Sequence, residues 1–226
     1  MKLRAVGTDA LMLYLGDSMR PDTLSRVTAA RTAIAAELGD DLVDIVPSYA
    51  SVLIVFDALR HSHAAIAARV RQALTALPAD KGERPREMSL PVYYAPEAGE
   101  DLETLAQSAG LAMDEVIALH SGTRYRVYAI GFAPGFAYLG EVNARIAQPR
   151  KATPRARVPR GAVGIADRQT AVYPSVSPGG WNLIGRCPLR LFDPQADPCM
   201  PLQVGDSVRF EPITRERFLE LGGELP

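Results

Sequence analysis

Hydrophobic and polar residues in the first part of the chain follow two alternating periods. Strand-like alternation or runs of β-branched side chains cover residues 10–16, 42–49, 51–57 and 86–95. Apolar residues recur at helical spacing over residues 20–40 and 63–77. The resulting order, β-α-β-β-α-β, predicts a ferredoxin-like split fold in which the two middle strands form a hairpin.

The ends of these elements carry residues with known helix and loop preferences. Asp22 is a candidate N-cap of the first helix, and Gly39 is a candidate C-cap. The stretch 78–87 is charged and contains prolines, so it predicts a connection rather than an element.

The second part of the chain begins with helices and continues with short strands. Acidic residues at the start and a glycine at the end predict helices over 100–110 and 113–122. Strand-like runs then predict a strand at 124–131, a hairpin at 161–174 that turns near Asp167–Arg168, and strands on both sides of a Gly205–Asp206 turn within 201–213. Of the chain's 36 glycines and prolines, 15 lie between residues 131 and 188, which predicts short strands joined by tight turns, as in a small β-barrel.

Composition and charge exclude several classes of protein. The 226 residues are 47% hydrophobic and carry a net charge of −1, so no overall field attracts nucleic acid or a membrane surface. Neither a signal-peptide core nor an apolar run of membrane-spanning length is present. The two cysteines, Cys187 and Cys199, form no CxxC pattern, so we expect no zinc site and no disulfide framework. These features predict a cytoplasmic protein of one or two domains with no bound metal.

One stretch, GFAPGFAYLG at residues 131–140, combines features that a plain turn does not need. Gly131 and Gly135 permit backbone angles closed to other residues, and Pro134 fixes one angle. Phe132 and Phe136 favour burial or contact with a ligand. We therefore expect a rigid, shaped loop.

The segment 142–166 is the clearest electrostatic feature of the chain. It contains six cations and no acidic residue, namely Arg145, Arg150, Lys151, Arg155, Arg157 and Arg160. Arginine forks suit bidentate binding of carboxylates and phosphates, and the prolines of the segment would aim these side chains. The alternative is a solvated loop whose ionic partners lie elsewhere in the chain.

Two further places are candidates for chemistry. Ser175, Ser177 and the amides around Gly179–Gly180 could form a nest of donors for an anion, with Trp181 as a pocket wall or as a core residue. His120 ends a predicted helix, where it could act as a general acid or base or serve as a structural cap. P-loop, GxSxG, HExxH and GxGxxG motifs are missing. This combination indicates a site that another protein chain completes.

Three segments carry a family resemblance. GFAPGFAYLG (131–140), TPRARVPRGAVGIADRQTAVYPSVSPGGWNLIGRCPLRLFDP (153–194) and LQVGDSVRFEPI (202–213) closely resemble the family of 5-oxoprolinase B subunits, also called the KipI-type or allophanate hydrolase subunit 1 family. LHSGTRYRVYAIGF (119–132) fits the segment that the family carries just upstream. Ala137 departs from the pattern, in which a second proline is expected.

The resemblance implies an α+β protein with an N-terminal ferredoxin-like domain (residues 1–85) and a C-terminal cyclophilin-like β-barrel of the carboxyltransferase type (residues 86–226). It implies a protein that works with the A and the homologous C subunits of 5-oxoprolinase. The complex would open 5-oxo-L-proline to L-glutamate with ATP, which could bind at one of those partners. The resemblance leaves two alternatives open, which are a KipI-type inhibitor of a sensor histidine kinase and a component of a urea or allophanate pathway.

The candidate site residues follow from the residue patterns together with the resemblance. We expect catalytic roles for His120, Arg155 and Arg157. We expect substrate or anion binding by residues of the shaped loop and of the two later segments, namely Gly131, Phe132, Pro134, Gly135, Phe136, Arg160, Gln169, Tyr173, Ser177, Pro178, Gly179, Gly180 and Trp181.

Overall fold

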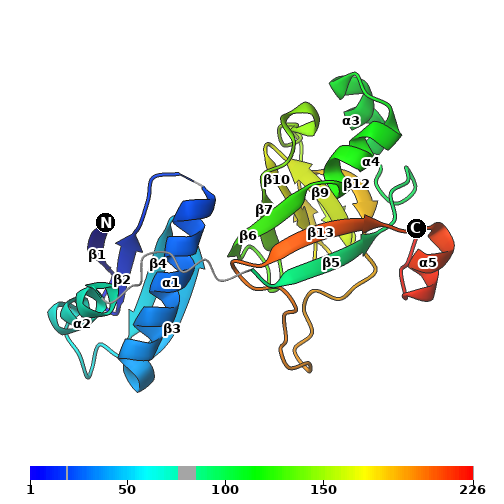
Figure 1. The fold of residues 1–226 in the computed structure, drawn as a ribbon. Coiled ribbons are helices and arrows are strands. Elements are labelled where there is room, and N and C mark those ends of the chain that lie inside the picture. The colour runs from blue at the N-terminus through cyan, green and yellow to red at the C-terminus, as the bar shows by residue number, and fades with distance from the viewer. Residues whose placement is uncertain (19, 76–84, 226) are drawn as a thin grey trace. The chain divides into compact units, whose positions relative to one another are not determined.

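A computed structural model describes residues 1–18, 20–75 and 85–225. The chain divides into two compact units, Met1–Arg84 and Pro85–Pro226, and each is described by itself (Figure 1). Most of the connection expected over residues 78–87 lies outside the described residues. No helix within these ranges has both the length and the apolar character needed to cross a membrane.

The first unit is a four-stranded antiparallel sheet covered by two helices. Its elements are β1 (Lys2–Val6), β2 (Ala10–Tyr14), α1 (Pro21–Leu38), β3 (Leu42–Ser48), β4 (Ser51–Phe56) and α2 (His63–Thr75), with a short 3-10 turn over Gly39–Asp41. The strand order is β1-β2-β4-β3, and β3 and β4 form the predicted hairpin. Alternate residues of β4, including Val52 and Ile54, are buried in one core with apolar residues of both helices.

The predicted sixth element of this unit is wrong. The strand expected over residues 86–95 is β5 (Glu87–Val92), and it pairs in parallel with β13 (Ser207–Pro212) in the second unit. The edge of the first sheet beside β2 is occupied instead by β1, which the sequence analysis missed. The β-α-β-β-α-β order of the ferredoxin-like prediction is therefore not observed in the first unit.

The ends of α1 agree with the sequence at one terminus only. Gly39 adopts a φ of +50° and donates its N–H to the Ala35 carbonyl, which confirms the predicted C-cap. At the other end Arg20 is the N-cap and Pro21 is the first helical residue. Asp22 lies inside the first turn and accepts a hydrogen bond from Arg20 Nε at 3.0 Å, so the predicted N-cap is wrong.

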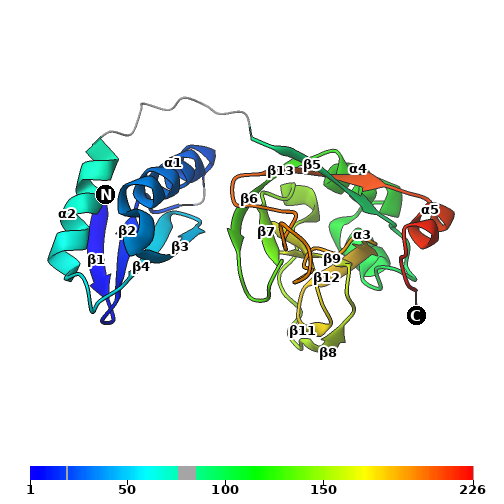
Figure 2. The ribbon, with the colours of Figure 1, turned by 90° about the horizontal axis from the view of Figure 1, so that it is seen from below.

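The second unit contains a nearly closed barrel-like sheet. Besides β5 and β13 its elements are α3 (Leu102–Ala109), α4 (Met113–Ser121), β6 (Arg124–Ile130), β7 (Ala137–Gly140), a 3-10 turn (Ala144–Ile146), β8 (Arg155–Val158), β9 (Ala162–Ala166), β10 (Gln169–Val172), β11 (Ser177–Gly179), β12 (Asn182–Arg186) and α5 (Arg215–Glu220). The sheet order is β12-β9-β10-β7-β6-β13-β5. Tyr93 and Arg186 exchange two backbone hydrogen bonds of 2.9 Å, which bring the two outer strands together. Figure 2 shows β8 and β11 as a separate ribbon at one end of this sheet.

The barrel interior is the main hydrophobic core of the unit. Inward residues of the strands, such as Tyr125, Ile165 and Phe210, meet Leu105 of α3 and Val116 of α4. This arrangement confirms the predicted α+β class and the short strands with tight turns.

The second unit agrees with one predicted turn and differs from the predictions in two other details. The hairpin of β9 and β10 turns at Asp167, which has a φ of +51°, as expected. In the 201–213 stretch, however, only β13 is a strand, and Gly205 at a φ of +97° belongs to the turn that precedes it. The short helix α5 was not predicted.

Candidate functional site

The shaped loop after β6 is held by a cluster of aromatic side chains. Gly135 has a φ of +83°, and a Cβ atom there would lie 2.3 Å from the Leu191 carbonyl oxygen. Phe136 is buried edge-on against Tyr173 and Trp181, at centroid distances of 5.3 and 5.6 Å. The loop is therefore held by close packing, and its glycine is required by a close backbone approach.

Phe132 is the exposed tip of the same loop. Its ring is 63% exposed, although it packs edge-on against Phe136 at 5.2 Å. Its backbone φ of +72° is uncommon for a residue other than glycine and costs on the order of 1 kcal/mol. The chain thus holds one large apolar side chain in solvent on strained backbone beside Pro134, which is also exposed.

The glycine-rich segment near β11 supports this aromatic cluster. A Cβ atom at Gly179 would lie 2.3 Å from the Tyr173 hydroxyl oxygen, so only glycine leaves room for that buried ring. Trp181 is 4% exposed and belongs to the core, with the Arg150 guanidinium 5.9 Å from its ring centroid. The core alternative for Trp181 is the one observed.

The remaining candidates of this region lie around the β8–β11 ribbon and the start of β10. Ser177 pairs opposite Val158, and its buried hydroxyl has no hydrogen-bond partner among the described residues. Pro178 is exposed, and the Gly180 carbonyl accepts a 2.7 Å hydrogen bond from the Lys151 amide. Gln169 lies opposite Ala166 in the hairpin, and Gly131 donates its N–H to the Phe136 carbonyl.

The basic segment 142–166 is partly neutralised by acidic residues from the start of α3. Asp101 accepts hydrogen bonds from Arg155 Nη2 at 2.7 Å, from Lys151 Nζ at 2.5 Å and from the Leu183 amide at 2.8 Å. Arg155 Nε also lies 2.6 Å from a Glu100 oxygen. Arg155 is thus committed to an ion-pair cluster, which we call the Asp101 hub. For Arg155 and Lys151 the ionic partners lie elsewhere in the chain, as the alternative interpretation of the segment expected.

The Asp101 carboxylate is charged in this environment despite its burial. Burial alone would raise its pKa, but the hydrogen bonds from Arg155, Lys151 and the Leu183 amide outweigh that effect and hold the pKa below its usual value. Because Asp101 is the N-cap residue of α3 and its carboxylate binds β12, the hub fastens the helix to the barrel.

Arg157 and Arg160 lie instead at a cavity of about 340 Å³, together with Arg186 from the end of β12. We call it the arginine cavity. The cavity wall is completed by Pro159, Ser175, Val176, Cys187, Pro188, Phe218, Gly223 and Glu224. The structure therefore separates the three expected arginines, because it places Arg155 in the hub and the other two at a cavity.

Arg186 is the member of the cavity that the sequence analysis missed. The residue is only 8% exposed; its Nη1 donates to the Glu224 carbonyl at 2.5 Å, and its Nε has no partner among the described residues. Burial lowers the pKa of its guanidinium, and Arg160 nearby adds to that effect, although Glu224 opposes it. A strand-like pattern in the sequence does not indicate whether an arginine at the end of the strand is buried, so the sequence analysis could not identify Arg186.

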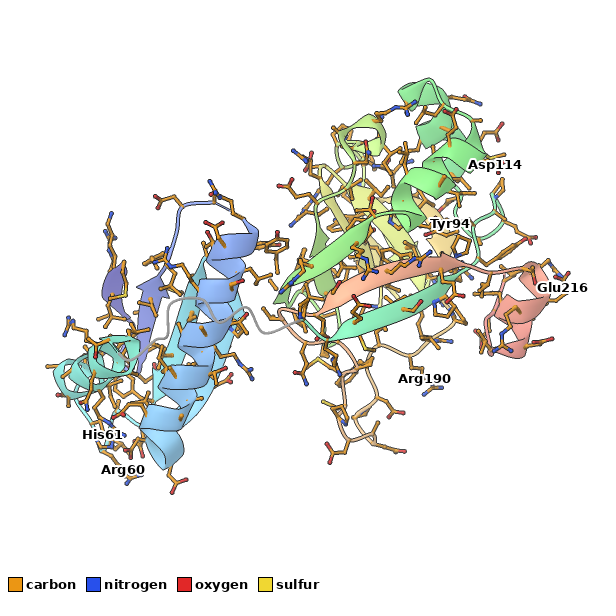
Figure 3. The ribbon with its side chains drawn as sticks, viewed as in Figure 1. Arg60, His61, Tyr94, Asp114, Arg190 and Glu216 are labelled. Carbon is orange, nitrogen blue, oxygen red and sulfur yellow. The ribbon has the colours of Figure 1, made fainter. Side chains whose placement is uncertain are left out.

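His120 is far from an exposed site, because it lies fully buried in the barrel core and stacks on Phe210 at 4.5 Å. Thr170 Oγ1 donates to the Gly164 carbonyl and so accepts from His120 Nε2 at 2.9 Å. His120 Nδ1 then accepts from the hydroxyl of Tyr94, a residue labelled in Figure 3, at 2.7 Å. Both ring nitrogens are occupied, and burial lowers the pKa of the imidazole to about 3. This environment fits a structural role in the core better than acid–base catalysis, although the ring nitrogens bond to Tyr94 and Thr170 rather than to helix carbonyls, as a cap would.

The two cysteines differ in burial, and we expect them to differ in reactivity. Cys187 is buried beside the arginine cavity, and burial raises its pKa to about 12, whereas Cys199 is exposed. Because only the thiolate is nucleophilic, we expect a thiol reagent at a pH of about 7.5 to modify Cys199 rapidly and Cys187 only after unfolding. Titration of the native protein with an aromatic disulfide should therefore detect one thiol, and a Cys199→Ser variant should show none. Rapid modification of that variant would contradict the assignment.

The chemistry available to this unit is that of anion binding. It offers clustered guanidinium groups, while its buried histidine is neutral and its buried thiol is protonated. Within the described ranges, no group of three or more His, Cys, Asp and Glu side chains could hold a metal ion.

Comparisons with known proteins find relatives over most of the chain. The family model described as carboxyltransferase domain, subdomain C and D, matches residues 1–202. A curated 5-oxoprolinase B subunit from Bacillus subtilis (strain 168) is 36% identical over 227 residues, which cover 96% of this chain and 95% of that protein. A second protein of that name, from Escherichia coli O157:H7, is 48% identical over 127 residues, which cover 56% of this chain and 58% of that protein.

Solved structures share the fold. The structure of TTHA0988 matches with a TM-score of 0.81 and 36% identity over 94% of this chain and 40% of that one, so this chain spans less than half of TTHA0988. The Kluyveromyces lactis urea carboxylase matches with a TM-score of 0.75 and 19% identity over 96% of this chain and 22% of that one. At that identity the likeness concerns the fold alone.

Proposed function

The chain belongs to the carboxyltransferase-domain family that includes the 5-oxoprolinase B subunits, and from this premise we propose that it is the B subunit of a 5-oxoprolinase complex. The observation that carries the proposal is the match to the Bacillus subtilis protein, which extends over 96% of this chain and 95% of that protein. The likeness to urea carboxylase gives no reason to prefer a urea or allophanate pathway, and no observation favours a histidine-kinase inhibitor.

We propose that the complex opens 5-oxo-L-proline to L-glutamate with ATP in the cytoplasm, and that its other members are the A and the homologous C subunits. Resonance makes the lactam amide a poor electrophile. Transfer of the γ-phosphoryl group to the amide oxygen would release ADP and activate the carbon. One water then adds, the ring C–N bond breaks to leave a protonated amine and an acyl phosphate, and a second water hydrolyses the acyl phosphate to the carboxylate and phosphate. Such a transfer needs fixed cations around the phosphoryl oxygens.

Within this chain we assign different roles to the three arginines of the basic segment. Arg157 and Arg160 are proposed to contact an anion, because both line a cavity. Arg155 is proposed to be a positioning residue, because its guanidinium is bound to Asp101 and Glu100. The exposed Phe132 and its loop are proposed to contact another member of the complex, because the aromatic side chain is held in solvent on backbone with a φ of +72°, and such strain is concentrated at functional sites.

The test is reconstitution from purified proteins. We expect no glutamate release by this chain alone, because its described residues offer anion-binding groups rather than an activated nucleophile. Addition of the A and C subunits should give glutamate release that depends on ATP and on this chain. Omission of this chain and omission of ATP are the controls. Turnover by the chain alone, or full turnover by the other members without it, would overturn the proposal.

A further inference from the structure

The arginine cavity carries a charge imbalance that the fold itself does not require. Three guanidinium groups line it, from Arg157, Arg160 and Arg186, and the only carboxylate among its lining residues is that of Glu224. The lining therefore carries a net charge of about +2, because arginine stays protonated in proteins. Such a concentration of like charge favours an anion that balances it.

Arg186 gives the strongest indication that the cavity binds an anion. A buried cation is costly unless charges and hydrogen bonds compensate it. Arg186 is 8% exposed, yet its Nη1 donates only to the neutral Glu224 carbonyl, and its Nε has no partner among the described residues. An anion in the cavity would supply both the acceptor and the compensating charge.

The cavity is built from fixed parts. A Cβ atom at Gly161 would lie 2.2 Å from the Cys187 carbonyl oxygen and 3.2 Å from Arg186 Cγ, so the backbone packs closely behind the arginine. Elsewhere in the wall, a Cβ atom at Gly223 would lie 2.4 Å from the Phe218 ring, and the Gly223 amide donates to the Phe218 carbonyl. Phe218 itself is fully buried and packs on Tyr93 at a centroid distance of 5.7 Å. The walls are thus positioned before any ligand binds.

Charge and size together indicate the class of ligand. A dianion matches the net charge of the lining, whereas a monocarboxylate would leave it positive. The volume of about 340 Å³ is in the range of small-molecule sites and exceeds the needs of a bare phosphate ion. Wall residues with accessible apolar surface, including Val176 and Pro159, would suit an organic part beside the charged group.

We propose that the arginine cavity binds a phosphate-bearing small molecule, with the phosphoryl group held by Arg157, Arg160 and Arg186. This proposal rests on the anion contacts that the proposed function assigns to Arg157 and Arg160, and it adds Arg186 and names the class of ligand. The two ideas fail separately: the proposed function is tested by turnover of the assembled complex, and this site by binding to the isolated full chain.

The experiment measures binding of AMP, inorganic phosphate and 5-oxoproline to the full chain by calorimetry at constant ionic strength. We expect saturable AMP binding that inorganic phosphate displaces, and much weaker binding of 5-oxoproline. Arg157→Ala and Arg160→Ala should each weaken AMP binding by roughly ten- to a hundredfold, the ratio expected for one charge-assisted hydrogen bond. Arg157 is exposed, so its variant should keep the melting temperature of the parent even if Arg186→Gln does not fold.

Arg190→Ala is the matched control. Arg190, labelled in Figure 3, is exposed, lies close in sequence to Arg186 and does not line the cavity. This variant should bind AMP like the parent, which separates a site from a general attraction of anions to arginine. Preference for 5-oxoproline, equal loss of affinity in the Arg190 variant, unchanged affinity in both cavity variants, or no saturable binding of AMP would each overturn the inference.

Discussion

An Asp101→Ala variant should lose about 3–5 kcal/mol in the free energy of unfolding of the second unit, because breaking a buried ion pair from one side costs that much. The carboxylate is 4% exposed and binds Arg155, Lys151 and the Leu183 amide. Its removal leaves Lys151 and the Leu183 amide without this acceptor and leaves Arg155 with Glu100 as its ionic partner. Urea unfolding followed by the fluorescence of Trp181 measures the effect, because this tryptophan lies in the same unit.

Neighbouring variants separate the hub from ordinary surface charge. Glu100→Ala should cost less than about 1 kcal/mol, since the Glu100 side chain is 60% exposed although it also contacts Arg155. Arg155→Ala should be nearly as destabilising as Asp101→Ala, and the double variant should cost much less than the sum of the two. If Asp101→Ala costs no more than Glu100→Ala, the hub does not fasten α3 to the barrel.

Acidification should destabilise the second unit steeply through His120, beginning well above the pH at which carboxylates titrate. The imidazole pKa is lowered to about 3 in the fold by burial, against about 6.5 when unfolded. The unfolded state therefore binds the proton first, and the stability present above a pH of about 6.5 is lost as the pH falls toward about 3. For this one group the slope is about 1.4 kcal/mol for each pH unit, or about 5 kcal/mol over the whole window.

His120→Gln is the variant that tests this assignment. It should be less stable than the parent at about pH 7, because the packing against Phe210 is lost, yet its stability should change less between about pH 6 and about pH 4.5. The stability that Asp101 contributes through its lowered pKa is lost only below about pH 4, so this loss does not obscure the effect of His120 between about pH 6 and about pH 4.5. Nitrogen NMR of the parent should show that the His120 ring is neutral and protonated on Nε2 at about pH 5. Titration of the His120 ring near pH 6.5 would contradict its burial.

Local patterns identified most elements, and the failures have physical causes. The β3–β4 hairpin and the Gly39 cap are decided by adjacent residues, so their sequence signal is complete. The partner of β5 is decided by a strand about 120 positions later, as the Glu87–Ser207 pairing shows, and no local period contains that information. The edge strand β1 was missed because it is short and mostly exposed, with charges at Lys2 and Arg4.

The candidate site was predicted as a region rather than as a set of contacts. The sequence indicated the rigid loop around Gly135 and the importance of the basic segment. It could not show that Asp101, which lies 54 positions before Arg155, neutralises that arginine, because barrel closure brings the two together. Acidic residues at the start of α3 were attributed to the helix dipole alone. Arg186 was overlooked because its role depends on burial, which a single strand-like run does not reveal.

The pairing of β5 with β13 sets the order in which the two units can fold while the ribosome synthesises the chain. All the strands and helices described in the first unit come from residues 2–75, so that unit can fold while synthesis continues. The barrel cannot close until Ser207–Pro212 has emerged and taken its place beside β5 and β6. Until then β5 exposes an unpaired edge to other nascent chains and chaperones. We therefore expect the second unit to complete its fold later in synthesis than the first.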